Sequence, residues 1–261
     1  PTDGTILFNG MDISKKMSRT DTQALRTQMQ MIFQDPMASL NPRKKVGDII
    51  GEGLDIHHMY HTHEEREQKI KSILAKVGLA PEHASRYPHQ FSGGQRQRVV
   101  IARALINDPE LVICDEPVSA LDVSVRSQVL NLLKDLHKER NLTYIFISHD
   151  LSVVEYLCDK VAVMYLGRIM EYAGKRELYG KPFHPYTKAL LSAIPVPDIH
   201  AKRDEVILQG ELPSPLNPPA GCLFSTRCPM ATEKCRQSRP ELTEITGDDG
   251  TKRSVACFLY Q

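Results

Sequence analysis

No apolar run among the 261 residues approaches the ~20 residues that a bilayer-spanning helix needs, so membrane contact is expected to come through a partner. Charge of one sign is also lacking, since 33 Lys and Arg stand against 32 Asp and Glu for a formal net charge of +1. No overall field therefore favours nucleic acid or anionic lipid. No secretory signal opens the chain, and it has no internal repeats or low-complexity tracts. The composition, 41% hydrophobic and 25% charged, is that of a globular protein with one large domain or a domain plus an extension.

The six cysteines are unevenly distributed, which argues against a disulfide framework spread through the fold. Cys114 and Cys158 lie in apolar or helical contexts that are typical of a core. Four more crowd about the last forty residues, separated by five, six and 21 residues: Cys222, Cys228, Cys235 and Cys257. Four converging thiolates are able to bind Zn²⁺ or an iron–sulfur cluster. Zinc fits this spacing poorly, because structural zinc sites usually contain a tight Cys-x₂₋₄-Cys knuckle. Reduced free cysteines are the alternative.

The order of the expected elements favours an α/β fold. Short apolar runs bounded by polar residues, at 111–114 and 142–147, are typical of strands buried on both faces. Apolar residues recur at helical spacing over residues 46–79, and an amphipathic helix is predicted over 124–140. Strands that alternate with helices indicate a parallel sheet with crossover connections. Near Pro182 the chain changes character, and proline punctuates an irregular tail.

Four histidines cluster at the joint between the two helices predicted over residues 46–79: His57, His58, His61 and His63. A metal site is one interpretation of this cluster. A solvated polar turn is favoured, because no carboxylate or cysteine is clearly placed to complete a ligand set.

A serine followed by two glycines and a polar, basic run describes a loop that leads into a helix N-terminus, at Ser92, Gly93, Gly94 and Gln95. Unpaired backbone N–H groups at such a terminus, with a hydroxyl beside them, form a site for phosphate oxygens. Glycine lets the backbone approach the anion closely. An ordinary turn before a helix is the alternative for this stretch taken alone.

Two acids follow the apolar strand predicted at 111–114, at Asp115 and Glu116. Open parallel sheets bind ligands at the carboxyl ends of their strands. Such a pair suits a nucleotide–Mg²⁺ site, in which Asp115 holds the water shell of the metal and Glu116 orients or deprotonates an attacking water. His149 and Gln34 also follow predicted strands. We expect His149 to hydrogen-bond the transferred phosphoryl group and Gln34 to coordinate Mg²⁺ or the water.

In this order the motifs resemble the ATP-binding subunits of ABC transporters over nearly the whole chain. Gln34 matches the Q-loop, residues 91–95 the signature loop, 111–116 the Walker B strand, 119–122 the D-loop and His149 the switch histidine. Further segments resemble ATPases of dipeptide and oligopeptide importers, above all the F-type subunits of dipeptide permeases, some of which also carry haem: 33–36, 40–42, 115–122, 184–187, 210–215 and the cysteine region.

The resemblance implies an α/β nucleotide-binding domain over residues 1–180, with a parallel sheet and a helical subdomain at about 43–108. An irregular, cysteine-containing extension over 181–261 would follow. It implies Glu116, His149 and Gln34 as catalytic residues, with Asp115 and Gln34 near Mg²⁺. The implied nucleotide contacts are Ser92, Gly93, Gly94, Gln95, Asp115 and Asp122. Peptide-importer ATPases that resemble this chain carry a [4Fe–4S] cluster on four cysteines, so that cluster is favoured over Zn²⁺ at Cys222, Cys228, Cys235 and Cys257.

One expected motif is missing: no Gly-x-x-x-x-Gly-Lys-Ser/Thr loop occurs anywhere in these residues. The family places this Walker A loop before the first strands, so the chain looks like an N-terminally truncated subunit. Without the lysine and the N–H groups of that loop the triphosphate loses its main anchors. We therefore expect these 261 residues alone not to turn over ATP at their own Walker B strand.

The resemblance also implies partners. Two ATPase subunits would pair head-to-tail on two membrane permease subunits, at the cytoplasmic face of the inner membrane, with an extracytoplasmic peptide-binding protein acting indirectly. Each signature loop would complete the ATP site of the opposite subunit. Solute choice lies with the permease and binding protein, which leaves dipeptides, longer peptides, haem, nickel chelates and glutathione open. The alternatives are a catalytically inactive fragment, or a soluble ABC ATPase without a permease; no basic stripe favours nucleic acid.

Overall fold

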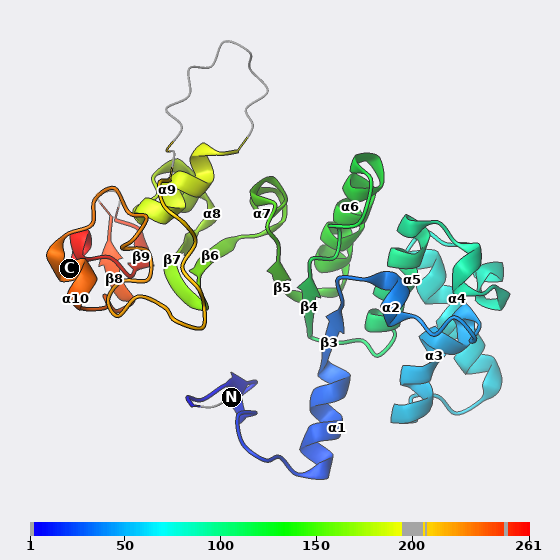
Figure 1. Cartoon of the computed structure of the whole chain (residues 1–261). Helices are drawn as coiled ribbons and strands as arrows, with labels where there is room; N and C mark the ends of the chain where they lie inside the picture. Colours follow the sequence, from blue (N-terminus) through cyan, green and yellow to red (C-terminus); the bar gives the residue numbers. More distant parts are fainter. Residues whose placement is uncertain (1–2, 195–205, 207, 248–249) are drawn as a thin grey trace. The chain divides into compact units, whose positions relative to one another are not determined.

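The computed structural model describes residues 3–194, 206, 208–247 and 250–261 (Figure 1). Contacts between residues divide the chain into two compact units, Pro1–His149 and Asp150–Gln261, and each is described by itself. The predicted domains, 1–180 and 181–261, stay a prediction. Among the described residues no helix is both long and apolar enough to cross a bilayer.

The first unit is built on a parallel sheet, as the alternation of strands and helices predicts. Its strands are β3 (Met29–Ile32), β4 (Leu111–Asp115) and β5 (Thr143–Ile147), hydrogen-bonded in that order. Met29 lies opposite Leu111, and Leu111 lies opposite Thr143. The three strands therefore end together, at the same edge of the sheet.

Burial differs between the two strands that were expected to be buried on both faces. On β4, Val112 and Cys114 have no exposed surface. On β5 the expectation is wrong, because Ile145 and Ile147 remain 49% and 47% exposed. The exposed residues Thr143, Ile145 and Ile147 alternate along β5 and share one face, which the described part of the chain leaves open.

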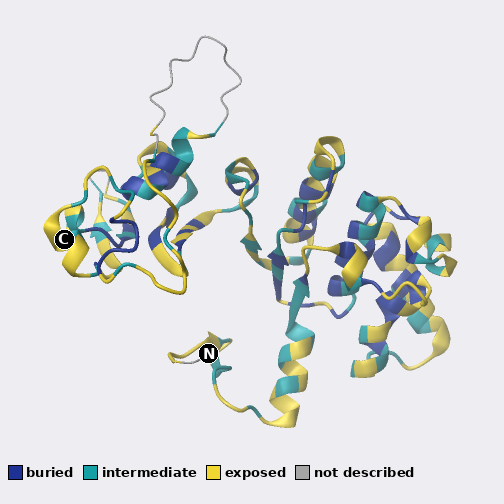
Figure 2. Ribbon diagram, in the orientation of Figure 1, coloured by how far each residue is buried: buried dark blue, intermediate teal, exposed yellow. Residues whose placement is uncertain are grey.

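The first unit also contains the helices α1 (Arg19–Gln28), α3 (Val46–His57), α4 (His63–Lys76), α5 (Gly93–Leu105), α6 (Val123–Arg140) and the 3₁₀ helices η1 (Pro81–Ser85) and η2 (Pro88–Gln90). Apolar residues at helical spacing meet where α3, α4 and α5 pack, so that Ile50, Leu74 and Ile101 are fully buried (Figure 2). The chain opens on a hairpin of β1 (Leu7–Phe8) and β2 (Met11–Asp12) around Asn9 and Gly10.

The segment after β3 was expected to be a loop because it holds two prolines. It contains one turn of helix instead, α2 (Pro36–Ser39). Asp35 accepts hydrogen bonds from the N–H groups of Met37 and Ala38 at 2.7 and 3.3 Å, and so caps the turn. Proline is tolerated at a first helical position because its missing N–H would have no helical partner there.

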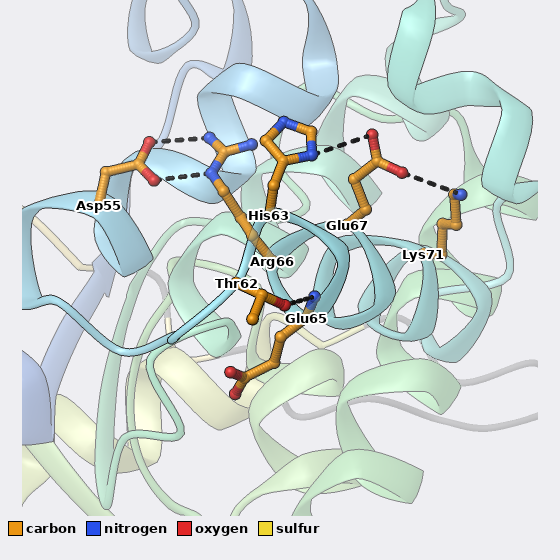
Figure 3. Close-up of polar contacts among 7 residues, drawn as sticks. All are labelled: Asp55, Thr62, His63, Glu65, Arg66, Glu67 and Lys71. Atoms are coloured by element: carbon orange, nitrogen blue, oxygen red, sulfur yellow. Dashed lines mark hydrogen bonds and ion pairs between the residues drawn. The ribbon is translucent and has the colours of Figure 1, made fainter.

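The joint between α3 and α4 is held by polar contacts (Figure 3). Arg66 donates two hydrogen bonds to Asp55, at 2.6 and 2.8 Å, and these bonds lower the pKa of Asp55 below its usual range. The other pairs in Figure 3 are Thr62–Glu65, His63–Glu67 and Glu67–Lys71. Of the clustered histidines, His63 lies 3.7 Å from Glu67, and His57 shares a hydrogen bond with Thr27. The exposed side chains there are those of a polar helix joint.

The second unit has an antiparallel sheet in the order β6-β7-β9-β8. Its elements are α7 (Leu151–Leu157), β6 (Lys160–Tyr165), β7 (Arg168–Gly174), α8 (Lys175–Gly180), α9 (Pro185–Ser192), α10 (Glu233–Gln237), β8 (Thr243–Thr246), β9 (Lys252–Val255) and the 3₁₀ helix η3 (Phe258–Tyr260). The parallel arrangement predicted for the chain does not extend to β6 and β7. Two residues join them, which is too short for a parallel crossover.

A buried carboxylate links β7 to the start of α9. Glu171 has no exposed surface, and its two oxygens accept hydrogen bonds from the N–H groups of Phe183 and His184, each at 2.9 Å. His184 caps α9 by accepting from the Tyr186 N–H at 3.0 Å, and its ring also hydrogen-bonds the backbone of Ala256. Burial of His184, which is 1% exposed, lowers its pKa from 6.5 to about 4.

We predict that acid destabilises the fold through His184. Because its pKa is lower in the folded chain, the unfolded chain binds the extra proton between pH 6.5 and 4, and stability is lost as the pH falls through that window. The loss attributable to His184 should reach about 3 kcal/mol at pH 4. Urea unfolding between pH 7 and 4 measures it. The variant His184→Asn keeps a capping side chain without the titration, and should show a shallower pH dependence. Equal slopes for both proteins would contradict the prediction.

Candidate functional site

Three side chains from the ends of β3, β4 and β5 meet at the edge of the parallel sheet. Gln34 donates from Nε2 to one oxygen of Glu116 at 2.9 Å. Nδ1 of His149 lies 2.9 Å from the other oxygen of the same carboxylate. Gln34 and His149 are 82 and 33 residues from Glu116 in sequence, so the strand register alone brings them together.

The backbone of Glu116 adopts a conformation that residues other than glycine rarely take, with φ of 45°. Its N–H donates to the Ile147 carbonyl at 3.0 Å, and its own carbonyl accepts from the N–H and hydroxyl of Ser119 at 3.2 and 3.0 Å. Such a conformation costs about 1–3 kcal/mol and persists where surrounding contacts hold it, often at functional sites. No sequence pattern signals this strain. In this backbone conformation the Glu116 carboxylate contacts both Gln34 and His149.

Exposure differs across this group. The side chain of Glu116 is 24% exposed and that of His149 is 70% exposed, so the carboxylate is sheltered while the imidazole is open to an incoming group. Asp115, the last residue of β4, is partly buried. Within the described residues, its carboxylate has no hydrogen-bond or ion-pair partner and is available for a ligand.

Ser92 and Gln95 form a capping box at the start of α5. The Ser92 hydroxyl accepts from the Gln95 N–H at 3.3 Å, and the Gln95 side chain accepts from the Ser92 N–H at 3.0 Å. In the part of the chain that is described, no hydrogen bond joins this box to Gln34, Glu116 or His149. The Ser92 hydroxyl, which was expected beside a phosphate, thus accepts a capping hydrogen bond.

The two glycines of that loop differ in what surrounds them. A Cβ on Gly94 would lie 2.2 Å from Cγ1 of Val125 on α6, so glycine is required there for the close approach of α5 and α6. A Cβ on Gly93 would meet only Leu121, at 3.9 Å. Asp122 precedes α6 and makes no side-chain capping bond. Glycine at position 94 is therefore explained by the packing of α5 against α6, in addition to the expected close approach to an anion.

In the second unit the four clustered cysteines come to one place. Cys222, Cys228, Cys235 and Cys257 line the same small cavity, and His184 borders it. Burial raises the pKa of the Cys222, Cys228 and Cys257 thiols. The described residues nevertheless contain no group of three or more His, Cys, Asp or Glu side chains already spaced to hold a metal ion. The four cysteines therefore lie around one cavity, but their side chains are not spaced to coordinate a metal ion.

Gly221 brings two of these cysteines together, and sequence reasoning did not identify it. The Cys222 N–H donates to the Cys235 carbonyl at 2.7 Å. A Cβ on Gly221 would lie 2.3 Å from that same carbonyl oxygen, so any other residue would push the two segments apart. Its position directly before Cys222 was the only available signal.

Comparison with known proteins matches two family models to this chain. Residues 1–119 match the model described as "ABC transporter", and residues 170–235 match "Oligopeptide/dipeptide transporter, C-terminal region". Two solved structures share the fold: CbiO1 from Clostridium perfringens, part of an ABC transporter complex, and the ATP-binding cassette MJ0796 bound to ADP and Pi. Their TM-scores are 0.61 and 0.60, with 30% and 27% identity, over 69% and 67% of this chain and 70% and 75% of theirs.

Similar curated proteins include the oligopeptide transport ATP-binding protein AppF of Bacillus subtilis, 55% identical over 100% of this chain and 78% of its own length. The oligopeptide transport ATP-binding protein OppF of Salmonella typhimurium is 52% identical over 98% of this chain and 76% of its own length. The parallel sheet, the strand-end residues and these matches agree, and the chain belongs to the ABC transporter family, among the ATP-binding proteins of oligopeptide and dipeptide transport.

Proposed function

We propose that this chain is the subunit of a peptide importer that binds ATP and couples its hydrolysis to the uptake of dipeptides or oligopeptides, with haem as a further candidate solute. The observation that carries the proposal is the Glu116 carboxylate, held between an amide and an imidazole at the carboxyl edge of a parallel sheet. The relatives AppF and OppF, by their names, are oligopeptide transport ATP-binding proteins.

In this function Glu116 is the general base. Two hydrogen bonds fix its carboxylate, which is then oriented to accept a proton from an attacking water. His149, whose side chain is 70% exposed, is proposed to hydrogen-bond the transferred phosphoryl group. The family's Gly-x-x-x-x-Gly-Lys loop does not occur in these 261 residues. These 261 residues therefore supply the general base and the histidine for hydrolysis, but not the loop whose N–H groups and lysine bind the phosphates.

The donor set also fits Mg²⁺. Asp115 is available, and because the Gln34 amide nitrogen donates to Glu116, the amide oxygen of Gln34 keeps its lone pairs. Mg²⁺ usually takes one or two protein oxygens and completes its octahedron with water and substrate phosphates. Two protein ligands are therefore enough, and the metal would neutralise phosphate charge during hydrolysis.

The signature loop is proposed to act on ATP held by a second ATPase subunit, in a head-to-tail pair. The capping box uses the Ser92 hydroxyl and the Gln95 N–H, which leaves the N–H groups of Gly93 and Gly94 at the start of α5. Such groups attract phosphate oxygens. In the same assembly Asp122, directly before α6, would lie close to the shared nucleotide.

The loop after Gln34 is proposed to receive a helix of the permease. Phe33 and Met37, on either side of Gln34 and Asp35, are 48% and 51% exposed, which is unusual for large apolar side chains next to a sheet. Contact there would join the permease to the residue that holds Glu116. Two permease subunits would thus keep the ATPase pair at the cytoplasmic face of the inner membrane, below an extracytoplasmic peptide-binding protein.

The four cysteines are proposed to hold a [4Fe–4S] cluster, with Zn²⁺ as the alternative. The shared cavity and the required Gly221 support a ligand set of Cys222, Cys228, Cys235 and Cys257. Burial raises the pKa of three of these thiols, and loading needs thiolates, so loading would be favoured by higher pH. A bound cluster would tie together segments that are far apart in the sequence.

The transport function is tested with Glu116→Gln in the assembled transporter, reconstituted in lipid vesicles from a subunit that carries the Gly-x-x-x-x-Gly-Lys loop in addition to these 261 residues. ATP hydrolysis should fall by about 10²–10⁴-fold, the usual contribution of a general base, while ATP binding persists. Uptake of a labelled dipeptide should fall in parallel. The control Glu82→Gln alters an exposed carboxylate without a side-chain partner among the described residues, and should change neither rate. Unchanged hydrolysis in Glu116→Gln would contradict the role of Glu116, and hydrolysis without any peptide uptake would contradict the proposed solute.

The cysteine proposal is tested with Gly221→Ala. Purified without oxygen, the wild-type protein should be coloured and contain iron, whereas Gly221→Ala should lose most of its iron because the added Cβ displaces the Cys235 carbonyl. Gly180→Ala is the matched control, since a Cβ there meets no atom within 4 Å. Iron assay and visible absorption measure the outcome. A colourless wild-type protein with one zinc per chain would overturn the cluster.

A further inference from the structure

A second cavity in the unit Asp150–Gln261 has no role in any function described so far. It has a volume of about 310 Å³ and lies between the first residues of β7 and the segments around Leu223 and Leu242. Cavities that bind small molecules begin at about this volume, ~300 Å³. Cys222 and Pro240 border both this cavity and the one lined by the four cysteines.

The walls of the cavity are aliphatic. They include Ile169, Met170, Leu223 and Leu242, and Met170 and Leu223 are only 4% and 3% exposed. The lining residues, all of which the structure describes, include no aromatic ring on which a base would stack, and no hydroxyl or amide side chain to recognise a sugar. The occupant that these walls fit is a small molecule with an aliphatic part.

Two arginines, Arg168 and Arg239, line the cavity and give it a positive charge, and its lining contains no Asp or Glu to offset them. Arg239 donates from Nε to the Gly221 carbonyl at 3.2 Å and from Nη2 to the Pro219 carbonyl at 3.1 Å, which fixes its side chain. Arg168 is exposed and, within the described part of the chain, has neither an ion pair nor a hydrogen bond from its side chain. Two arginines in one lining, one with a free side chain and one with a fixed side chain, are suited to an anion, which each would bind through charge-assisted hydrogen bonds.

We propose that this cavity binds a small organic carboxylate with an aliphatic side chain, of about the size of an N-acylated amino acid. The carboxylate would lie against Arg168 and Arg239, and the side chain would be buried against Ile169, Leu223 and Leu242. The proposal is independent of ATP hydrolysis, and none of the contacts proposed for the ligand involves a cysteine.

The test is a calorimetric titration of the full chain with N-acetylleucine. It should bind with a Kd of about 1 mM, as befits a ligand of few atoms. N-acetylleucinamide has the same shape without the charge, and acetate has the charge without the side chain. Each should bind at least about tenfold more weakly, because each loses one of the two kinds of contact.

Variants then assign the binding to this cavity. Arg168→Gln should weaken N-acetylleucine binding by about tenfold, the value of one charge-assisted hydrogen bond. Ile169→Glu, which places a carboxylate at the cavity, should abolish binding. Arg236→Gln is the control, because Arg236 is exposed, lies near Glu233 and does not line the cavity. The proposal is overturned if no heat of binding appears up to about 10 mM, ten times the expected Kd. It is equally overturned if the amide binds as tightly as the acid, or if Arg168→Gln and Ile169→Glu both bind like the wild-type chain.

Discussion

The parallel register of three strands is the constraint on which the hydrolytic site depends. Because β3, β4 and β5 run in the same direction and end together, residues far apart in sequence meet at one edge of the sheet. Glu116 then receives a hydrogen bond from Gln34 on one side and contacts His149 on the other. Its strained backbone, held by the Ile147 carbonyl and by Ser119, keeps the carboxylate in this position. A single slip of register would separate all three side chains.

The second unit is organised around a different buried carboxyl group. Glu171 accepts two backbone hydrogen bonds at the start of α9, and Arg253, only 2% exposed, lies over the ring of Phe183 at 4.3 Å. These contacts fix the segment that leads to His184 and the cysteine cavity. Hydrogen bonds from two backbone N–H groups satisfy this buried carboxylate, whereas a buried carboxylate without partners would be destabilising. The irregular, proline-rich part of the chain is therefore anchored by hydrogen bonds more than by regular structure.

Much of the first unit could be predicted from sequence because local patterns and tertiary structure agree there. The apolar run that forms β4, and the cap at Ser92 before α5, carry their own signals. The exposure of β5 could not be read, since an apolar run does not say whether both faces are covered. The turn of helix α2 was hidden because its segment holds the prolines Pro36 and Pro42, although Asp35 before Pro36 is a capping signal.

Within the site, sequence predicted which residue types to expect but not how they are held. That Gln34 and His149 contact the same carboxylate depends on strand register, and the φ of Glu116 depends on contacts with Ile147 and Ser119. The packing of Gly94 against Val125 is likewise a tertiary fact. Sequence gives the identity of a glycine, whereas the atom that its missing Cβ would meet is known only from the fold.

The most direct measurement of the central claim is a double-mutant cycle on ATP hydrolysis by the assembled transporter, with Gln34→Ala, His149→Ala and the double variant. If both side chains act by holding the Glu116 carboxylate, removing the second after the first should cost little. The account predicts that the double variant hydrolyses ATP about as slowly as the worse single variant, which is strong coupling between the two positions. Rate losses that simply multiply would contradict it, because Gln34 and His149 would then act independently of each other and of their shared carboxylate.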